Sequence, residues 1–378
     1  MGTKFGFVNT YPPTHCGIAT FSASLISAIQ EDPKNSVSVV RLVDSDETTS
    51  SELDSAEVVS IMRAGQPNSL QIAADLLNEL DVAIIQHEFG IYGGVDGEEA
   101  ITLLQSLRIP TIVVLHTVLA EPTVNQRAVF MKICSLASAV VTMSRSSRDQ
   151  LVANYLVDPR KIFPIPHGAR PVANPEYKGI GDSPLVLTWG LIGPGKGIEW
   201  AIEAMHKLRD MKNTPRYVVA GRTHPKVLER NGEAYRRSLQ DRVDKLGMKD
   251  SVVLQGDYMS AETLDDLIST ASVILLPYDS TDQATSGVLI EAIAAWRPVV
   301  ATGFPHANEL LATGAGLVVA HRDPIAIAEG IRKILEEPEL AQSMSNRARI
   351  MASDLLWPAV AARYVRLATR LIRSEVAA

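Results

Sequence analysis

The sequence predicts two doubly wound α/β domains, each with a parallel sheet covered by helices on both faces. Its 378 residues exceed what one hydrophobic core usually organises and match two domains of ordinary size. Short apolar runs alternate with longer amphipathic stretches along the chain, which is typical of βαβ units. The Pro- and Gly-rich segment 170–184 interrupts this alternation near the middle and indicates a linker.

The first series of elements lies before that segment. Apolar runs of four to seven residues predict buried strands at Phe5–Val8, Val37–Val43, Val82–Ile85, Thr111–Leu115 and Ala139–Thr142. The amphipathic stretches between them predict helices at Ala19–Ile29, Leu70–Leu80, Gly97–Leu107 and Asn125–Leu136. This series predicts an N-terminal domain of residues 1–175.

The second series follows the same plan and predicts a C-terminal domain of residues 176–357. Its strands are expected at Leu185–Trp189, Arg216–Ala220, Val252–Gln255, Val273–Leu276 and Val299–Thr302. The tail is helical in pattern, with a break expected at Trp357-Pro358. Residues 358–378 are therefore predicted to form a separate final helix. Ligands of such domains bind beyond the carboxyl ends of the strands, in a cleft expected between the two domains.

Composition excludes several classes of protein. A charge of 36 − 43 = −7 argues against a general nucleic-acid binder. The two cysteines, Cys16 and Cys134, form no CxxC pair, which excludes a thiolate zinc site and a disulfide scaffold. No signal-peptide core and no apolar run of about 20 residues is present, so the expected location is the cytoplasm, without stable membrane insertion.

The loop after the first strand, Thr10–Phe21, carries Gly17 just before a helix. A glycine at that point lets backbone amides approach an anion, and the helix dipole favours the anion further. The alternative is an ordinary βα turn in which Gly17 serves only a positive φ.

The loop after Trp189 places four glycines and Lys196 at the start of a helix. Gly190 to Lys196 fits GxxxxGK, but Gly197 stands where a P-loop needs Ser or Thr for Mg²⁺. This argues against a nucleoside triphosphatase. Glycines and one lysine at a helix N-terminus still indicate a phosphate site, the alternative being a lysine on a solvated face.

The segment 282–298 contains a predicted buried helix, because every residue from Val288 to Trp296 except Glu291 is apolar. Ser286 is a natural N-cap, and Gly287 leaves the backbone open. A carboxylate in a buried helix needs a partner. That partner is either a ribose diol, which Glu291 could bind through both hydroxyls, or Arg297 in a purely structural pair.

Polar residues at strand ends give two further candidates. His87 and His116 end consecutive strands, so a functional role is favoured over a purely structural one for the pair. Asp44-Ser45-Asp46 also follows a strand and could hold a metal, but it opens a long acidic polar run typical of a solvated loop. The sequence therefore predicts no metal site.

Five short segments, taken together, resemble a known family. They are Pro12-Pro13 with Gly17, Ile165–Gly168, Gly195–Gly197, Val219–Gly221 and Ser286–Thr302 with Glu291 and Pro298. In order and spacing, these segments resemble the retaining glycosyltransferase family 4, the group 1 glycosyltransferases with the GT-B fold. The resemblance extends over essentially the whole chain, and it implies that the final helix, residues 358–378, crosses back onto the N-terminal domain.

The resemblance implies roles for individual residues. Gly17 would face the donor phosphate and the acceptor, Lys196 would bind the diphosphate, and Glu291 would hold the ribose. His116 would lie beside the transferred sugar. The helix-start amides that would bind the diphosphate are those of Ser286, Gly287 and Val288. The acceptor would bind at His87, Glu88 and Tyr92.

Three departures from the family pattern stand out. Gln283, with Asp282 beside it, replaces the first glutamate of the family's E-x7-E motif, which alters the donor-sugar contact. Leu191 replaces an arginine, so Arg222 is expected to supply the missing charge near the diphosphate. Trp296 stands where the family has glycine at a helix end.

The prediction is a retaining, metal-independent hexosyltransferase that uses no cofactor beyond its nucleotide-sugar co-substrate. Mannose or glucose is expected as the sugar, from a donor such as GDP-mannose or UDP-glucose, with the base read by backbone near residues 256–259. Residues 1–170 carry 12 − 18 = −6, so the expected acceptor is small or soluble, a saccharide or polyol, and not an anionic lipid. A sugar-nucleotide epimerase or a catalytically silent binding protein of the same shape is the alternative.

Overall fold

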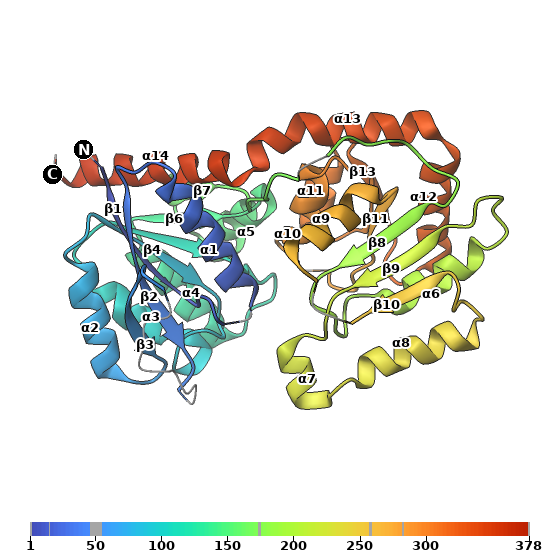
Figure 1. Cartoon of the computed structure of the whole chain (residues 1–378). Helices are drawn as coiled ribbons and strands as arrows, with labels where there is room; N and C mark the ends of the chain where they lie inside the picture. Colours follow the sequence, from blue (N-terminus) through green and yellow to red (C-terminus); the bar gives the residue numbers. More distant parts are fainter. Residues whose placement is uncertain are drawn as a thin grey trace. The chain divides into compact units, whose positions relative to one another are not determined.

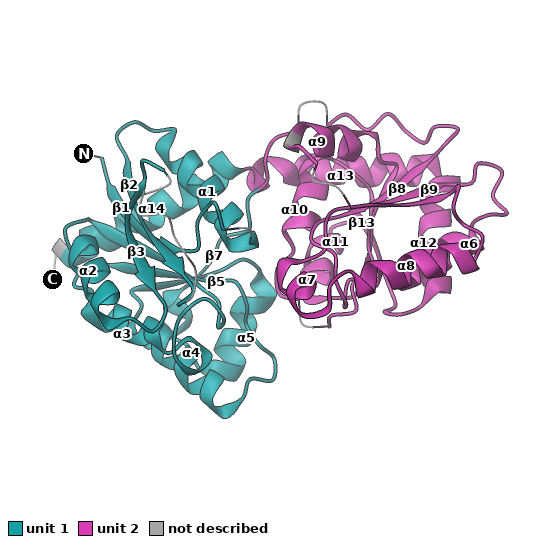
Figure 2. Ribbon diagram, turned by 60° about the horizontal axis from the view of Figure 1, so that its bottom comes forward, with its two compact units in different colours: residues 1–168, 357–378 teal, residues 169–356 magenta. Residues whose placement is uncertain are grey.

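The computed structural model describes residues 2–14, 16–45, 55–172, 175–256, 259–281 and 283–376. The chain divides into two compact units, shown in teal and magenta in Figure 2. Unit 1 contains residues 1–168 and 357–378, and unit 2 contains residues 169–356. The division falls after Gly168, seven residues before the boundary at residue 175 that the sequence predicts.

Unit 1 is built on a parallel sheet whose described strands follow the order β3-β2-β1-β4-β5-β6-β7. The strands are β1 (Lys4–Asn9), β2 (Ser36–Val43), β3 (Val58–Arg63), β4 (Val82–His87), β5 (Thr111–Leu115), β6 (Ala139–Thr142) and β7 (Ile162–Pro164). The helices are α1 (Gly17–Gln30), α2 (Pro67–Leu77), α3 (Glu99–Ser106), α4 (Val124–Leu136), α5 (Arg145–Tyr155) and α14 (Trp357–Val376), with 3₁₀ turns η1 (Val95–Gly97) and η2 (Pro159–Lys161).

Alternate residues of these strands feed two separate cores, one on each face of the sheet. On one face, Val8 and Ile85 pack with α2, α3 and α4. On the other, Phe7 and Ile84 pack with α1 and α14. Figure 1 shows α14 running beside α1, so the last helix of the chain completes the core of unit 1. This period-two pattern is what a sheet buried on both faces requires.

Unit 2 repeats the architecture with a parallel sheet in the order β10-β9-β8-β11-β12-β13. The described strands are β8 (Leu185–Trp189), β9 (Arg216–Ala220), β10 (Val252–Gln255), β11 (Val273–Leu276), β12 (Val299–Thr302) and β13 (Gly316–Val319). The helices are α6 (Ile198–Lys207), α7 (Pro225–Asn231), α8 (Ala234–Lys245), α9 (Ala261–Thr270), α10 (Gly287–Ala294), α11 (Pro305–Leu311), α12 (Pro324–Glu336) and α13 (Pro338–Leu355). The prediction of two doubly wound, Rossmann-like domains is confirmed.

The helix α10 ends in a turn that accounts for the unusual Trp296. The amide of Trp296 donates to the Ile293 carbonyl, and the amide of Arg297 donates to the Ala292 carbonyl. These two bonds form a Schellman motif, whose C′ residue takes the left-handed conformation. Trp296 has φ +58° there, the conformation that glycine adopts most easily. The Arg349 guanidinium lies 5.5 Å from the centre of its indole ring.

Among the helices that the structure describes, none combines the length and the apolar character needed to cross a bilayer.

Candidate functional site

In unit 2, the predicted donor residues follow the carboxyl ends of neighbouring parallel strands. Lys196 follows β8, Arg222 follows β9, and the segment leading to α10 follows β11. Because β8 lies between β9 and β11 in the sheet, these loops emerge next to one another.

Two glycines allow these loops to approach closely. A Cβ on Gly221, whose φ is +147°, would lie 1.9 Å from the carbonyl oxygen of Gly190. A Cβ on Gly197, with φ +64°, would lie 1.7 Å from the carbonyl oxygen of Pro277. Any other residue at either position would push the strand ends apart. The two glycines therefore shape the loop that carries Lys196.

Lys196 lies just before the N-terminus of α6, half-buried and without a carboxylate partner among the described residues. Its Nζ lies 4.3 Å from the centre of the Tyr278 ring, a cation–π contact. Burial lowers the pKa of Lys196 below its ordinary value. A partly desolvated cation beside the positive end of a helix dipole favours an anion at this point.

Tyr278, which sequence reasoning missed, joins Lys196 to the start of α10. Its hydroxyl is hydrogen-bonded to the side chain of Ser286, and burial raises its pKa to about 12. Its ring stacks on Phe304, and its carbonyl oxygen lies 2.9 Å from Nδ1 of His321. The ring that holds the lysine is therefore fixed from several sides.

The N-terminus of α10 is capped by Ser286, whose hydroxyl accepts from the amide of Leu289 at 3.2 Å. The amide of Ser286 itself donates to Nδ1 of His306 at 2.9 Å. That amide is therefore occupied, which corrects the expectation that it binds a diphosphate. Gly287 and Val288, the first two residues of the helix, have amides without an acceptor inside the helix.

Glu291, on helix α10, is partnered by the last residue of strand β8. The indole Nε1 of Trp189 donates to Oε2 of Glu291 at 3.0 Å. Burial raises the pKa of Glu291, while the bond from Trp189 opposes the rise. The alternative pair with Arg297 is wrong, because the Arg297 guanidinium donates to the carbonyls of Ala295, Pro175 and Glu176.

Two further residues predicted to bind the donor, Arg222 and Gln283, lie in the loops that follow β9 and β11. The Arg222 carbonyl accepts from the amide of Ile192 at 2.9 Å, which ties the two loops together. Gln283 donates through Nε2 to the carbonyl of Thr285 at 3.1 Å. Asp282 and residues 257–258, within the predicted base-reading segment, lie outside the described residues.

In unit 1, Gly17 is the first residue of α1. Cys16 caps this helix, and its Sγ accepts from the amide of Ala19 at 3.4 Å. The Cys16 sulfur also lies 3.1 Å from the hydroxyl of Thr10. Among the described residues outside its chain neighbours and its own helix backbone, none has an atom within 4 Å of the Cβ position of Gly17.

His116 follows β5 and is half-buried. Its Nε2 lies 2.7 Å from Oε1 of Gln86, on the neighbouring strand β4. Burial lowers the pKa of His116 to about 3, with further lowering by His167 and His87. The next residue, Thr117, donates to Oε2 of Glu88 at 2.5 Å. Two strand ends thus form one polar cluster that holds His116 and Glu88 together.

His87 and Tyr92, both predicted to bind an acceptor, are buried inside unit 1. They are 1% and 5% exposed, and His87 lies among the rings of Phe89, Tyr92 and Phe130. The Tyr92 hydroxyl donates to the carbonyl of Gln86 at 2.7 Å. Their burial argues against contact with an acceptor, because neither side chain reaches the surface. Glu88 remains a candidate for that role.

The described residues contain no group of three or more His, Cys, Asp or Glu side chains placed to hold a metal ion. In the rival Asp44-Ser45-Asp46 motif, Asp46 lies outside the described part of the chain.

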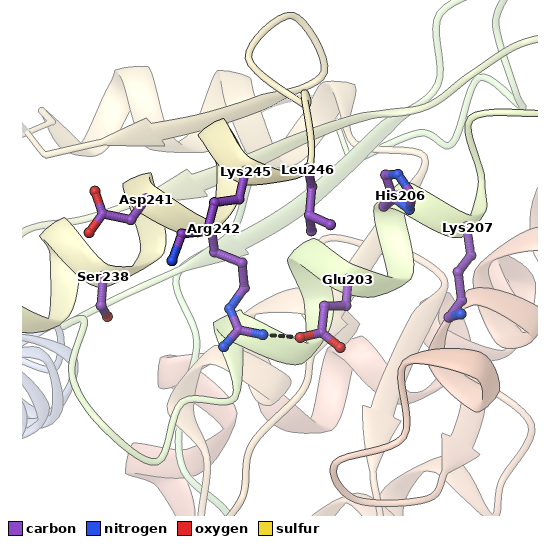
Figure 3. A pocket seen from close by; sticks show the side chains of 8 residues that line it. All are labelled: Glu203, His206, Lys207, Ser238, Asp241, Arg242, Lys245 and Leu246. Carbon is purple, nitrogen blue, oxygen red and sulfur yellow. Dashed lines mark hydrogen bonds and ion pairs between the residues drawn. The ribbon is translucent and has the colours of Figure 1, made fainter.

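A separate groove of about 530 Å³ lies between α6 and α8, at the end of α6 opposite Lys196 (Figure 3). Arg242 and Glu203 form an ion pair inside it. Its lining residues are Glu203, His206, Lys207, Ser238, Asp241, Arg242, Lys245 and Leu246. None of the predicted site residues is among them, so the groove supplies control positions for the experiments below.

The sequence of unit 2 matches a known family. Residues 173–351 match the profile of Glycosyl transferases group 1. Among curated relatives, this chain is 30% identical over 174 residues to the alpha-D-kanosaminyltransferase of Streptomyces kanamyceticus, covering 46% of this chain and 42% of that protein. It is 25% identical over 271 residues to the D-inositol 3-phosphate glycosyltransferase of Kineococcus radiotolerans, covering 65% and 60%. The chain thus spans about half the length of these glycosyltransferases.

Solved structures extend the likeness in fold to the whole chain. Anabaena HepE in complex with UDP has a TM-score of 0.76 at 15% identity, with 97% of this chain and 100% of that one covered. Sucrose-phosphate synthase from Thermosynechococcus elongatus has a TM-score of 0.75 at 19% identity, with 98% and 100% covered. The GT-B fold expected for a group 1 glycosyltransferase is confirmed.

The buried histidines of unit 1 predict a loss of stability in acid. Burial lowers the pKa of His87 and His167 to about 4 and that of His116 to about 3. The unfolded chain, with histidine pKa values near 6.5, binds more protons below pH 6.5 than the folded chain. Stability is therefore complete above pH 6.5 and falls by about 1.4 kcal/mol per pH unit for each histidine as the pH drops toward 4.

Denaturant unfolding between pH 7 and pH 4.5 tests this prediction. His87→Phe, which keeps an aromatic ring in the cluster, should flatten the dependence on pH, whereas His206→Phe in the groove should not. The same pH dependence in His87→Phe and in the unaltered protein would show that buried His87 is not a source of the acid sensitivity.

Proposed function

We propose that the protein transfers a hexose, mannose or glucose, from a nucleoside diphosphate sugar to a hydroxyl group of a small or soluble acceptor, with retention of configuration. The observation that carries this proposal is Lys196, a half-buried cation at a helix N-terminus that contacts an aromatic ring and has no carboxylate partner in the part of the chain that the structure describes. In a group 1 glycosyltransferase domain, such a cation is suited to a diphosphate.

Unit 2 would bind the donor through three kinds of group. The ammonium of Lys196 and the amides of Gly287 and Val288 would stabilise the diphosphate as negative charge develops on it during departure. Glu291 would accept hydrogen bonds from the ribose hydroxyls while Trp189 holds its second oxygen. Arg222 would add charge near the diphosphate, and Gln283 would contact the donor sugar.

Related proteins support this donor class. HepE was solved with UDP and with UDP-glucose, and the curated relatives are glycosyltransferases. UDP-glucose and GDP-mannose are the donors we propose to test first.

Unit 1 would bind the acceptor, with Gly17 at the α1 N-terminus and Glu88 as candidate contacts and His116 beside the transferred sugar. Its excess of acidic residues favours a neutral or cationic soluble acceptor over an anionic lipid surface. A saccharide or polyol acting in the cytoplasm fits this charge.

Release of free nucleoside diphosphate from UDP-glucose and GDP-mannose, with and without saccharide and polyol acceptors, tests the proposal. Transfer predicts free diphosphate and a glycosylated acceptor whose new bond keeps the donor's configuration. Conversion of one sugar nucleotide into another would instead identify an epimerase. Binding of a sugar nucleotide without turnover, whichever acceptor is added, would identify a catalytically silent binding protein. Gln283 and Leu191 raise this alternative because they replace two charged residues of the family pattern.

Turnover should not require a divalent metal, because Lys196 and helix N-termini supply the positive charge that a metal would otherwise provide. Dialysis against EDTA should leave the rate of diphosphate release unchanged, and added Mn²⁺ should not increase it. Abolition by EDTA with recovery in Mn²⁺ would contradict this part of the proposal.

A further inference from the structure

Gln86 is a fully buried polar residue in the otherwise apolar strand β4 of unit 1. Its backbone carbonyl accepts from the Tyr92 hydroxyl at 2.7 Å, and its side-chain Oε1 lies 2.7 Å from Nε2 of His116. A buried amide is costly unless its hydrogen bonds are made. The contact with His116 therefore explains why a glutamine stands at this buried position of β4.

Asn9 fixes which end of the Gln86 amide faces the histidine. Val8 pairs with Ile85, so Asn9 and Gln86, one residue further along, lie side by side on the same face of the sheet. The Asn9 amide donates through Nδ2 to the carbonyl of Thr10 at 2.8 Å, which leaves Oδ1 pointing elsewhere. Oδ1 of Asn9 and Nε2 of Gln86 are both buried and without a partner in the part of the chain that the structure describes.

Of these two unpartnered atoms, Oδ1 of Asn9 is an acceptor with a partial negative charge and Nε2 of Gln86 is a donor with a partial positive charge, so the two attract each other. Turning the Gln86 amide over would instead leave two buried acceptor oxygens, and no donor, without partners on these neighbouring strands. The orientation with Oε1 toward His116 is therefore favoured. An oxygen in that position can only accept, so Nε2 of His116 must carry the hydrogen.

We propose that Gln86 is a positioning residue that holds His116 as a neutral imidazole protonated on Nε2, which leaves Nδ1 as a hydrogen-bond acceptor for a ligand hydroxyl. The statement about the ligand rests on the proposed function. The statement about the tautomer does not.

The surroundings keep this imidazole neutral. Burial is the main cause that lowers the pKa of His116, and among the described residues His167 and His87 lower it further. Nδ1 of His167 lies 2.6 Å from the carbonyl of Gly168, so His167 donates from Nδ1. Burial lowers the pKa of His167 to about 4, which keeps it neutral near pH 7. The helix α1 contributes the uncharged ring of Phe21, 5.1 Å from that of His116.

The nearby carboxylate of Glu88 is occupied by the Thr117 hydroxyl and the Phe89 amide. His116 can therefore accept a hydrogen bond at Nδ1 but has no proton to give from that atom. The structure therefore gives His116 the role of orienting a ligand hydroxyl group. It does not give His116 the role of a general acid.

Imidazole ¹⁵N NMR of the full-length chain, without any donor or acceptor, tests the tautomer. The His116 signals should report a protonated Nε2 and a bare Nδ1 throughout pH 5 to 8. Gln86→Leu should lose this preference and give mixed tautomers. Gln150→Leu is the matched control, because Gln150 also has a buried unpartnered Nε2 in unit 1 but no contact with His116. It should leave the His116 signals unchanged.

Gln86→Glu gives the decisive comparison, because it keeps the shape and replaces the amide by a carboxylate. The His116 pKa should rise, so the imidazole should be charged at neutral pH and become neutral only at higher pH. Diphosphate release by Gln86→Glu should then be at least about ten-fold slower than in the unaltered protein at pH 7. Its rate should recover as the pH rises, whereas the rate of the unaltered protein should show no such increase with pH.

A bare Nε2 in the unaltered protein, or His116 signals unaffected by Gln86→Leu, would overturn the proposal. An absence of turnover in all variants and in the unaltered protein would count against the proposed function alone, since the NMR result does not depend on it. Turnover by Gln86→Glu with the pH profile of the unaltered protein would overturn the role of Nδ1 as the acceptor.

Discussion

Lys196→Met will lower the rate of diphosphate release from the nucleotide sugar by about 100-fold or more. Removing one preorganised charge-stabilising group from a transition state typically costs two to three orders of magnitude in kcat. Methionine keeps an unbranched apolar side chain that can lie against the Tyr278 ring, so the loop should keep its shape. Steady-state kinetics with the best donor of the panel measures the effect.

Lys207→Met is the matched control, because Lys207 lies on the same helix, α6, at the end opposite Lys196. It should leave turnover unchanged. Equal activity in Lys196→Met and Lys207→Met would mean that the glycine-rich loop does not bind the diphosphate.

Glu291→Gln will raise the KM for the donor by about ten-fold or more while the fold persists. The amide still offers an oxygen to the Trp189 indole. It lacks the negative charge, so it weakens hydrogen bonds from the ribose that are each worth about 1.5–3 kcal/mol to a charged acceptor. The free energy of unfolding should change little, because Arg297 makes its bonds to backbone carbonyls and does not depend on Glu291.

Glu203→Gln serves as the comparison, since Glu203 is also half-buried and partnered in unit 2 but lies in the groove with Arg242. Its donor KM should match that of the unaltered protein. A Glu291→Gln protein with normal donor affinity and a lowered melting temperature would show that Glu291 is purely structural.

The positions of most strands in both sheets could be predicted, because a parallel strand that is buried on both faces consists of a short continuous run of apolar residues. All ten predicted strands are present. The strands that were missed lie toward sheet edges: β3, β7 and β13. In β3, several side chains are partly exposed, and β7 has only three residues, so neither gives a long apolar run.

The backbone features of the site were also predictable, because glycines and an N-cap at strand-to-helix junctions can be read from the sequence. The partners of the functional side chains could not be. Tyr278 reaches Lys196, and Gln86 reaches His116, only because β8 pairs with β11 and β4 pairs with β5. Such neighbours follow from the order of strands in the sheet, which short sequence motifs do not contain.

The hydrogen bond from the Ser286 amide to His306 could not be predicted for the same reason. His306 lies on α11, beyond the strand β12 that follows α10, so it is twenty residues away in sequence. Likewise, the burial of His87 and Tyr92 depends on the rings of Phe89 and Phe130, which a strand-end position does not reveal.

Binding of UDP, GDP and ADP to the full chain tests the central claim most directly, since it needs no acceptor. One nucleoside diphosphate should bind saturably and, at 100 times its Kd, stabilise the protein by about 2.7 kcal/mol. Lys196→Met should weaken this binding, and Lys207→Met should not. Failure of all three nucleotides to bind, or binding unaffected by Lys196→Met, would contradict the assignment of unit 2 as the donor-binding unit.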